Sequence, residues 1–294
     1  MNLIQNRTMD EERALYGLHN AEVVNCEFSG PLDGESALKE CGNINIKNCR
    51  FLLRYPLWHL NGGSMENSLM TETCRAAMWY DKNFVIENTE INGIKAVREC
   101  DDVTIKNCKI NSEEFGWFCR KMKIENCGLV SVYPFLQCRN LEINGLKMQG
   151  KYSFQYAENV TIKNSVFDTK DAFWHSKNVT VTDSIIKGEY LAWYSENLHL
   201  IRCKIIGTQP LCYGKGLIME ECEMQDCDLA FEYSDVKARI KGTVESVKNP
   251  LSGYIHAGRI GKIIIDEHCV KNAGCEIKTL KNKNRVCCKR NIMQ

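Results

Sequence analysis

One phrase returns along this chain at a fixed interval. Residues 159–167 read NVTIKNSVF, and residues 178–186 read NVTVTDSII. Each copy alternates apolar and polar residues, which is typical of a β-strand, and then ends in residues that favour a turn. Counted from the first apolar residue of each copy, successive steps of 19 residues connect Phe84, Val103, Met122, Leu141, Val160, Val179, Leu198, Leu217 and Val236.

A short period sustained over most of a chain is the signature of a solenoid. Nineteen residues are too few for a pair of helices, and each copy contains three short apolar segments separated by turns. We therefore predict an all-β fold, a single-stranded right-handed parallel β-helix of about a dozen coils in which each strand pairs with its equivalent one coil away. We expect an N-terminal cap at residues 1–19, formed by a short helix or strand. The coils are expected at residues 20–240, and a C-terminal cap with a basic tail at residues 241–294.

Two columns of asparagine occupy fixed positions of the repeat. Asparagine tolerates the left-handed conformation at a corner, and stacked amides bond to one another along a solenoid axis. Both columns therefore indicate corners of the coil. The first column holds Asn25, Asn48, Asn67, Asn88, Asn107, Asn126 and Asn164, and the second holds Asn20, Asn43, Asn83, Asn140, Asn159, Asn178 and Asn197.

Many of the 17 cysteines also fall into register, although the tail pair Cys287 and Cys288 does not. Cys26, Cys49 and Cys108 share a repeat position that Ser165 and Ser184 fill in other copies. This exchange indicates a slot for a small buried side chain, where cysteine packs as a small hydrophobe. The chain has no C-x-x-C spacing, so we expect no metal site and no cofactor.

Composition limits the partners and the compartment. The formal net charge is +1, which favours neither nucleic acid nor a membrane surface. No apolar run is long enough to span a bilayer, and the first residues, MNLIQNRTMDEERALYG, do not form a secretory signal. We expect a cytoplasmic protein.

The chain resembles the right-handed parallel β-helix proteins of the pectin-lyase-like superfamily. Segments such as DGESALKEC, RYPLWH, TKDAFWHS and GTQPLCY are similar to a bacterial family of such helices whose function is uncharacterised. The resemblance implies the fold, and it implies function only weakly, because this fold hosts lyases, hydrolases, esterases, isomerases and inert scaffolds. The chain lacks the calcium-binding aspartates of pectate lyases and the paired aspartates of polygalacturonases, which argues against a simple pectinase.

The third segment of each copy carries aromatic residues in two adjacent columns. All five tryptophans, Trp58, Trp79, Trp117, Trp174 and Trp193, share one column. Neighbouring columns on a strand face opposite ways, so one of the two is expected at the surface. Filling of the core and an exposed binding strip are both open interpretations of the tryptophan column. The adjacent column is less suited to a core and holds His59, Tyr80, Glu99, Phe118, Gln137, Tyr156, His175, Tyr194 and Tyr213.

Charged residues lie near these columns and suggest two candidate sites. In the first, Arg98 or Lys95 would accept a proton or clamp an anion, with His59 or Glu99 as its acid–base partner. Solvated or mutually paired surface charges are the alternative interpretation. The residues expected to bind substrate there are Arg54, Trp58, Arg75, Trp79, Lys95 and Trp117.

The second candidate site pairs carboxylates from successive coils. Asp171 and Glu189 would perform acid–base chemistry on a glycosidic bond, with His175 adjusting them. A histidine that is simply packed against tryptophan is the alternative interpretation. The residues expected to bind substrate there are Tyr156, Trp174, Trp193 and Tyr194.

Together these features favour recognition, and as an option cleavage, of an oligosaccharide or sugar conjugate in an aromatic and charged groove. An enzyme of this kind would resemble a polysaccharide lyase or a glycoside hydrolase. The alternative is a non-catalytic scaffold or interaction module, in which the same face binds a protein partner or forms a homo-oligomer.

Overall fold

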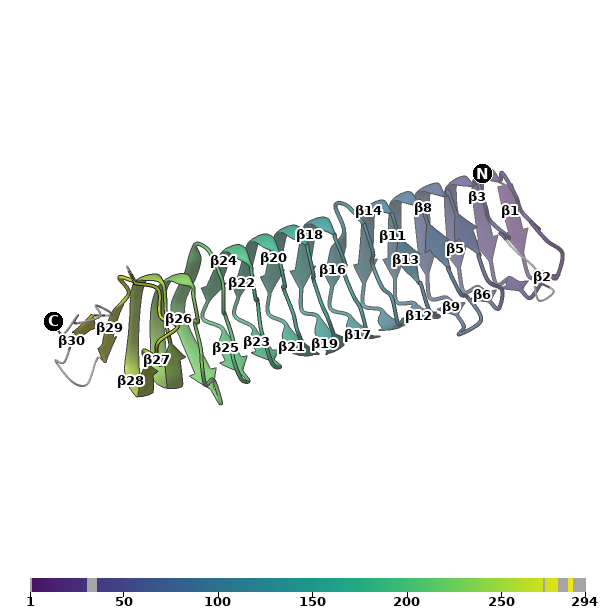
Figure 1. Ribbon diagram of the computed structural model, residues 1–294. Helices are drawn as coiled ribbons and strands as arrows, with labels where there is room; N and C mark the ends of the chain where they lie inside the picture. Colours follow the sequence, from purple (N-terminus) through teal and green to yellow (C-terminus); the bar gives the residue numbers. More distant parts are fainter. Residues whose placement is uncertain (1, 31–35, 272, 280–284, 288–294) are drawn as a thin grey trace. The chain divides into compact units, whose positions relative to one another are not determined.

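The computed structural model describes residues 2–30, 36–271, 273–279 and 285–287. The chain forms two compact units, Met1–Gly150 and Lys151–Gln294. Within each unit, successive strands lie side by side as the turns of a parallel β-helix (Figure 1). Connections between parallel strands of one sheet are right-handed in nearly all proteins. The predicted fold class, an all-β right-handed parallel β-helix, is confirmed.

Each turn of the first unit begins with a main strand, usually of six residues. In these strands alternate side chains point into the coil and are buried. The main strands are β1 (Asn2–Gln5), β3 (His19–Val24), β5 (Gly42–Lys47), β8 (Asn61–Glu66), β11 (Lys82–Glu87), β14 (Asp101–Lys106), β16 (Lys123–Glu125) and β18 (Arg139–Asn144).

A corner separates each main strand from a shorter second strand. These second strands are β2 (Thr8–Met9), β4 (Glu27–Phe28), β6 (Arg50–Phe51), β9 (Leu69–Met70), β12 (Glu90–Asn92), β15 (Lys109–Asn111), β17 (Gly128–Ser131) and β19 (Lys147–Lys151). A third set of two-residue strands forms a small separate sheet: β7 (Leu57–Trp58), β10 (Met78–Trp79) and β13 (Val97–Arg98).

The second unit repeats this arrangement and then widens into longer strands. Its main strands are β20 (Glu158–Lys163), β22 (Lys177–Thr182) and β24 (Glu196–Ile201), and its second strands are β21 (Val166–Lys170), β23 (Ile185–Lys187) and β25 (Lys204–Ile206). The longer strands that follow are β26 (Leu217–Gln225), β27 (Asp235–Lys248) and β28 (Ser252–Ile264), and they precede β29 (Glu276–Thr279) and β30 (Arg285–Cys287).

The pairing register follows the sequence repeat. Val160 pairs with Val179, and Val179 pairs with Leu198. Buried aromatic side chains also stack between coils, as in Phe154 and Phe173, whose ring centroids lie 4.7 Å apart with planes 8° from parallel. Equivalent residues one coil apart therefore lie over each other, as the repeat predicts.

The asparagine columns form amide ladders at left-handed corners. Asn25 donates to the Asn6 side chain at 3.1 Å, and Asn178 donates to Asn159 at 3.0 Å. The backbone at Asn25 has φ 53° and at Asn178 φ 54°. The predicted corner role of both columns is confirmed at these positions.

The ends of the chain also contain strands. β1 pairs in parallel with β3, so residues 2–9 stack on the following turn by strands rather than by a helix. Parallel pairing continues from β27 through β28 to β29, beyond residue 240, where the sequence predicted the coils to end. The roles of the two ends as caps stay predictions. Residues 280–284 and 288–294 of the basic tail lie outside the described residues.

The cysteine slot has a hydrogen-bonding role beyond its small size. The Cys49 amide donates to the Ser68 hydroxyl one coil further along, at 3.0 Å. Its thiol donates to the Lys47 carbonyl at 3.3 Å and accepts the Cys26 amide at 3.4 Å. A side chain that both donates and accepts therefore completes the backbone bonding at this corner, which explains why cysteine alternates there with serine, and with threonine at Thr89, whose hydroxyl accepts the Ser68 amide.

Candidate functional site

The tryptophan column is half-buried, and its indole groups are anchored within the chain. Four of the five indole N–H groups donate to a backbone carbonyl of the following coil, and Trp79 donates to the Glu99 carboxylate at 3.2 Å. The four carbonyl acceptors are Ala76 for Trp58, Tyr133 for Trp117, Tyr190 for Trp174 and Gln209 for Trp193. These polar ends of the tryptophans are bound within the protein and are not available to a ligand.

Arg98, a candidate of the first predicted site, lies among aromatic rings. Its guanidinium carbon is 5.0 Å from the Trp79 ring and 5.1 Å from the Trp117 ring. Its nitrogens approach the carboxylates of Glu99 at 3.6 Å and Glu114 at 3.5 Å. These cation–π and ionic contacts engage the charge of Arg98 within the protein.

Lys95 completes this cluster, because its ammonium group lies 3.6 Å from the same Glu114 carboxylate. The structure thus gathers Lys95, Arg98, Glu99 and two tryptophans as the sequence predicted. It adds Glu114, which the sequence analysis did not include among the site residues. Arg75 is exposed and Arg54 is half-buried.

The column next to the tryptophans is more exposed and adopts the left-handed conformation. The φ angle is 57° at His59 and 55° at Tyr156. In the second unit its rings stack nearly parallel: Tyr156 and His175 lie 4.9 Å apart at 4°, and His175 and Tyr194 lie 5.0 Å apart at 7°. Tyr194 and Tyr213 follow at 4.7 Å and 14°.

The second predicted site contains two carboxylates in different surroundings. Asp171 is 7% exposed, and burial raises the pKa of its carboxyl group, to which the charge of Glu189 adds. Glu189 itself is exposed and forms an ion pair with Lys170 at 3.0 Å. The ring of His175 stacks within the aromatic column.

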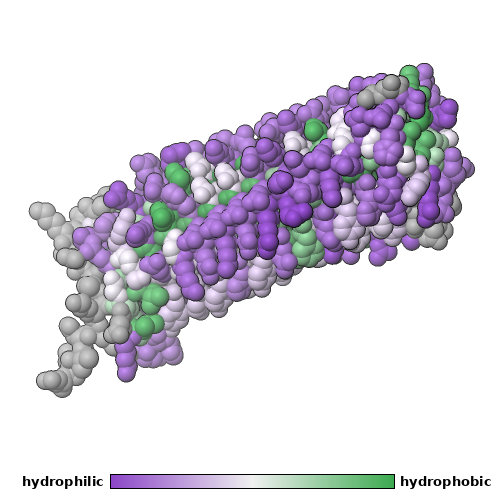
Figure 2. All heavy atoms as spheres, turned by 90° about the horizontal axis from the view of Figure 1, so that it is seen from above, coloured by the Kyte–Doolittle hydropathy of each residue, from purple (hydrophilic) through white to green (hydrophobic). Residues whose placement is uncertain are grey.

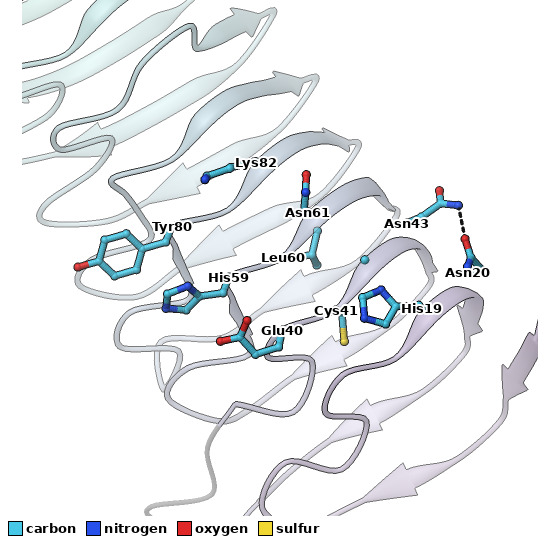
Figure 3. A pocket seen from close by; sticks show the side chains of 11 residues that line it. His19, Asn20, Glu40, Cys41, Asn43, His59, Leu60, Asn61, Tyr80 and Lys82 are labelled. Carbon is cyan, nitrogen blue, oxygen red and sulfur yellow. Dashed lines mark hydrogen bonds between the residues drawn. The ribbon is translucent and has the colours of Figure 1, made fainter.

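A polar groove of about 480 Å³ lies in the first unit, at the corner that leads into β3, β5, β8 and β11. Glu40, His59 and Tyr80 form one bank (Figure 3). His19 and Asn61 lie across the groove from them, and the chain at Cys41 and Leu60 runs between the two banks. Lys82, from the next coil, belongs to the lining as well. Of the sequence-predicted residues, only His59 lines this groove.

Gly42 makes room for the imidazole of His19. A Cβ atom at residue 42 would lie 2.5 Å from His19 Nδ1, well inside contact distance. The backbone at Gly42 is not left-handed, so glycine is needed there because a side chain would not fit, and not because of the backbone conformation. The histidine ring therefore packs directly over the Gly42 backbone at the wall of the groove.

The sequence contained a signal for this groove. His19, Gly42, Asn61 and Lys82 are register partners on successive main strands. The next position in this series is Asp101, which forms an ion pair with Arg120 at 2.9 Å. The groove therefore lies along the coils in which the residue at this register position forms no such ion pair. Irregular steps of 23 and 21 residues between the first coils hide this alignment.

A second groove, of about 380 Å³, lies in the other unit and is lined mainly by charged residues. Arg202 donates two hydrogen bonds of 2.7 Å to Asp183, and Lys241 pairs with Glu221 at 3.2 Å. These charged side chains are already paired with one another, which leaves them less available to a ligand. The groove in the first unit is therefore the stronger candidate site.

The remaining surface is largely hydrophilic on the face shown in Figure 2, where polar residues form parallel rows with scattered apolar ones among them. The described part of the chain contains no helix long and apolar enough to cross a membrane. Among the same residues, no group of three or more His, Cys, Asp or Glu side chains is placed to hold a metal ion.

A family model described as "Protein of unknown function (DUF3737)" matches residues 2–278. No functionally curated protein matches the chain. Among solved structures it is similar to PfbA, a surface adhesin of Streptococcus pneumoniae, with 11% identity over 76% of this chain and 71% of that chain and a TM-score of 0.35.

Two epimerase structures are also similar. The A-module of the Azotobacter vinelandii mannuronan C-5 epimerase AlgE4 shows 9% identity over 89% of this chain and 84% of that chain, with a TM-score of 0.26. A double mutant of the periplasmic alginate epimerase AlgG shows 11% identity over 90% of this chain and 76% of that chain, with a TM-score of 0.37.

Proposed function

The chain belongs to the family described as "Protein of unknown function (DUF3737)", and from the chemistry of its own surface we propose that it binds an oligosaccharide or a sugar conjugate. The observation that carries this proposal is the groove of about 480 Å³ between Glu40, His59 and Tyr80 on one side and His19 and Asn61 on the other.

The composition of the groove favours a polyol over an apolar ligand. It offers a carboxylate that only accepts, an ammonium group that only donates, and amide, imidazole and phenol groups that do both. A sugar ring presents hydroxyl groups that donate and accept in every direction, so it satisfies such a mixed lining. Lys82, with no carboxylate bonded to it among the described residues, favours a sugar that carries an acidic group.

The groove is held in shape by its own contacts, which lowers the ordering cost of binding. Asn43 donates to the Asn20 side chain at 2.8 Å along one rim. The amide of Leu60, which lines the groove, donates to the buried Asp81 carboxyl group at 2.9 Å. On the opposite bank, the rings of His59 and Tyr80 pack against each other with their centroids 5.0 Å apart and their planes tilted by 32°.

The residues predicted from sequence have three different roles in this proposal: direct binding, support of the groove, and stability of the coils. His59 is a direct ligand-binding candidate. Trp58 and Trp79 support the same bank, because Trp79 stacks on Tyr80 at 5.7 Å and contacts Trp58 at 5.3 Å. We assign the Arg98 cluster to the stability of the neighbouring coils.

A glycan array containing neutral, uronic-acid and phosphorylated sugars, followed by titration calorimetry on the best binder, tests the proposal. We expect His59→Asn and Lys82→Gln each to weaken binding at least tenfold, which corresponds to about 1.4 kcal/mol. Asparagine suits the left-handed backbone of residue 59, so the first change tests the imidazole rather than the fold.

Lys109→Gln is the matched control, because Lys109 is an exposed lysine of the same unit that lies outside the groove and is paired with Glu90. Binding should be unchanged in this variant. Absence of glycan binding by the unaltered protein, or equal binding by all four proteins, would remove the proposal.

A second candidate function, cleavage of a glycosidic bond, is favoured by one observation in the second unit. Asp171 has a raised pKa while Glu189 is exposed and ion-paired, and a carboxyl pair in different surroundings is what an acid and its partner base require. Release of reducing ends from any glycan bound on the array tests this. Asp171→Asn should abolish release, and release that persists in this variant would exclude the site.

A further inference from the structure

Two charged side chains of the groove in the first unit have no ionic partner of their own. Glu40 lies beside His59 on one bank, and Lys82 belongs to the lining on a later coil (Figure 3). Both residues are exposed, and among the residues that the structure describes neither forms a salt bridge or a side-chain hydrogen bond. Their charges are therefore available to a ligand.

The charged residues on the next coil are paired within the chain. Glu99, in the same column as Glu40, accepts a hydrogen bond from an indole N–H at 3.2 Å and lies 3.6 Å from a guanidinium nitrogen. Asp101, the register partner of Lys82, binds Arg120 at 2.9 Å. The groove thus ends where internal pairs begin, and it keeps one anion and one cation that the described part of the chain does not compensate.

The two uncompensated charges stand at different ends of the groove. Glu40 comes just before β5 and Lys82 is the first residue of β11, with β8 paired between these strands. Neighbouring strands lie about 4.8 Å apart, so two steps separate the two residues by roughly 10 Å along the stack of coils. Lys82 also shares its register position with Asn61, which lies across the groove from Glu40. The groove therefore has an acidic end on one bank and a basic end on the other.

Opposite charges at the two ends select a ligand that is itself dipolar. Hydrogen bonds between charged groups are shorter and stronger than neutral ones, so a carboxylate favours an ammonium group, and an ammonium group favours a phosphate or a carboxylate. A neutral sugar compensates neither charge, and a sugar acid compensates only Lys82. An amino sugar joined to an acidic unit compensates both, and it binds in one direction because the reverse would bring like charges together.

Building on the proposed function of this groove, we propose that its ligand is an oligosaccharide with a free amino group that binds Glu40 and an acidic group on another unit that binds Lys82. The imidazole, phenol and amide groups between these ends bind the hydroxyl groups of the sugars. N-acetylation removes the positive charge of an amino sugar, so the groove distinguishes free amines from their acetylated forms. Glu40 is the residue that determines this specificity.

Titration calorimetry with three disaccharides tests the proposal. The first joins glucosamine to glucuronic acid, the second is its N-acetylated form, and in the third glucose replaces the glucuronic acid. The unaltered protein should bind the first about three to five times more tightly than either of the others, a range that an exposed ion pair supplies. Added salt should reduce both preferences, because it screens exposed charges. A fourth compound, with a phosphate ester in place of the uronic acid, distinguishes the two sources of the acidic group.

Two substitutions assign each charge of the ligand to its partner in the groove. Glu40→Gln should abolish the preference for the free amine and leave the preference for the acidic unit, and Lys82→Gln should do the reverse, because each removes one charge. Glu72→Gln is the matched control, because Glu72 is an exposed glutamate of the same unit that lies outside the groove. This variant should keep both preferences. Near-ultraviolet circular dichroism confirms that each variant is folded.

The outcomes separate this inference from the proposed function. Equal affinities of the unaltered protein for the free amine and its acetylated form, or a preference for the amine that survives Glu40→Gln, would overturn the inference. Binding of a neutral oligosaccharide in that case would leave the proposed function standing. If neither the disaccharides nor any glycan on the array binds, both are removed.

Discussion

At the scale of single residues, the shape of the groove depends on the absence of a side chain at Gly42. Gly42→Ala would put a methyl group 2.5 Å from His19 Nδ1, so the imidazole has to swing away. We expect at least tenfold weaker binding of the groove ligand in calorimetry. Stability should change little, because the backbone of residue 42 suits alanine.

Gly128→Ala provides the control for this change. Gly128 also lies in a strand of the first unit and has no left-handed φ, and a methyl group added there would meet no atom within 4 Å. Its replacement should leave binding intact. Equal affinities of both variants and the unaltered protein would show that His19 does not shape the site.

A second residue-scale prediction concerns Asp81, which is fully buried beneath the groove. Its Oδ1 accepts the Leu60 amide, while its Oδ2 has no hydrogen-bond partner in the described part of the chain. Burial raises the pKa of this carboxyl group well above its usual value, and the nearby thiol of Cys100 adds to the shift.

The sign of the resulting pH dependence follows from proton binding. Above the unfolded pKa of about 3.9, the unfolded chain loses a proton that the native state keeps, so stability falls as pH rises, by about 1.4 kcal/mol per pH unit. This fall in stability ends above the native pKa. Asp81→Asn should remove the pH dependence, and urea unfolding from pH 4 to pH 9 measures the free energy of unfolding at each pH. The exposed Asp102→Asn is the control, and a pH profile of Asp81→Asn that parallels the unaltered protein would contradict the assignment.

At the scale of the coil, the cysteine slot predicts which substitutions the corner accepts. Cys49→Ser keeps a group that donates to the Lys47 carbonyl and accepts the Cys26 amide. Cys49→Val has a similar size but loses both bonds. The Cys26 amide then has no acceptor among the described residues, at a cost of about 1–3 kcal/mol, whereas the Lys47 carbonyl still accepts the Asn25 amide at 2.9 Å. Thermal unfolding should therefore rank serine well above valine, and the reverse order would show that the slot selects size alone.

The coil is also the scale at which sequence reasoning was most successful. The 19-residue repeat was sufficient to predict that Val160 lies over Val179, because parallel pairing forces equivalent residues together. It could not predict the anchoring of the Trp174 indole on the Tyr190 carbonyl, which depends on where a backbone turn places one oxygen atom. The groove was missed because Gly42 and Lys82 lie on coils with irregular spacing.

At the scale of the whole molecule, both units bury thiols along their length. Every cysteine from Cys26 to Cys275 is free and buried. Burial raises the pKa of Cys41 to about 11, and burial raises that of Cys74 and Cys212 to about 12. Only the thiolate reacts with alkylating agents, so these residues should be protected twice, by low access and by low ionisation.

Pulsed alkylation at pH 8 followed by peptide mass spectrometry measures this protection. Among the cysteines from Cys26 to Cys275, we expect Cys269 to react first without denaturant, because it is 8% exposed and lies outside the strands. Cys100 and Cys119 should react only when urea opens their coils, since each coil of a solenoid is stabilised by its two neighbours. Rapid labelling of Cys100 in the native protein would mean that adjacent coils separate readily, and the left-handed corners that shape the groove would then not be fixed in solution.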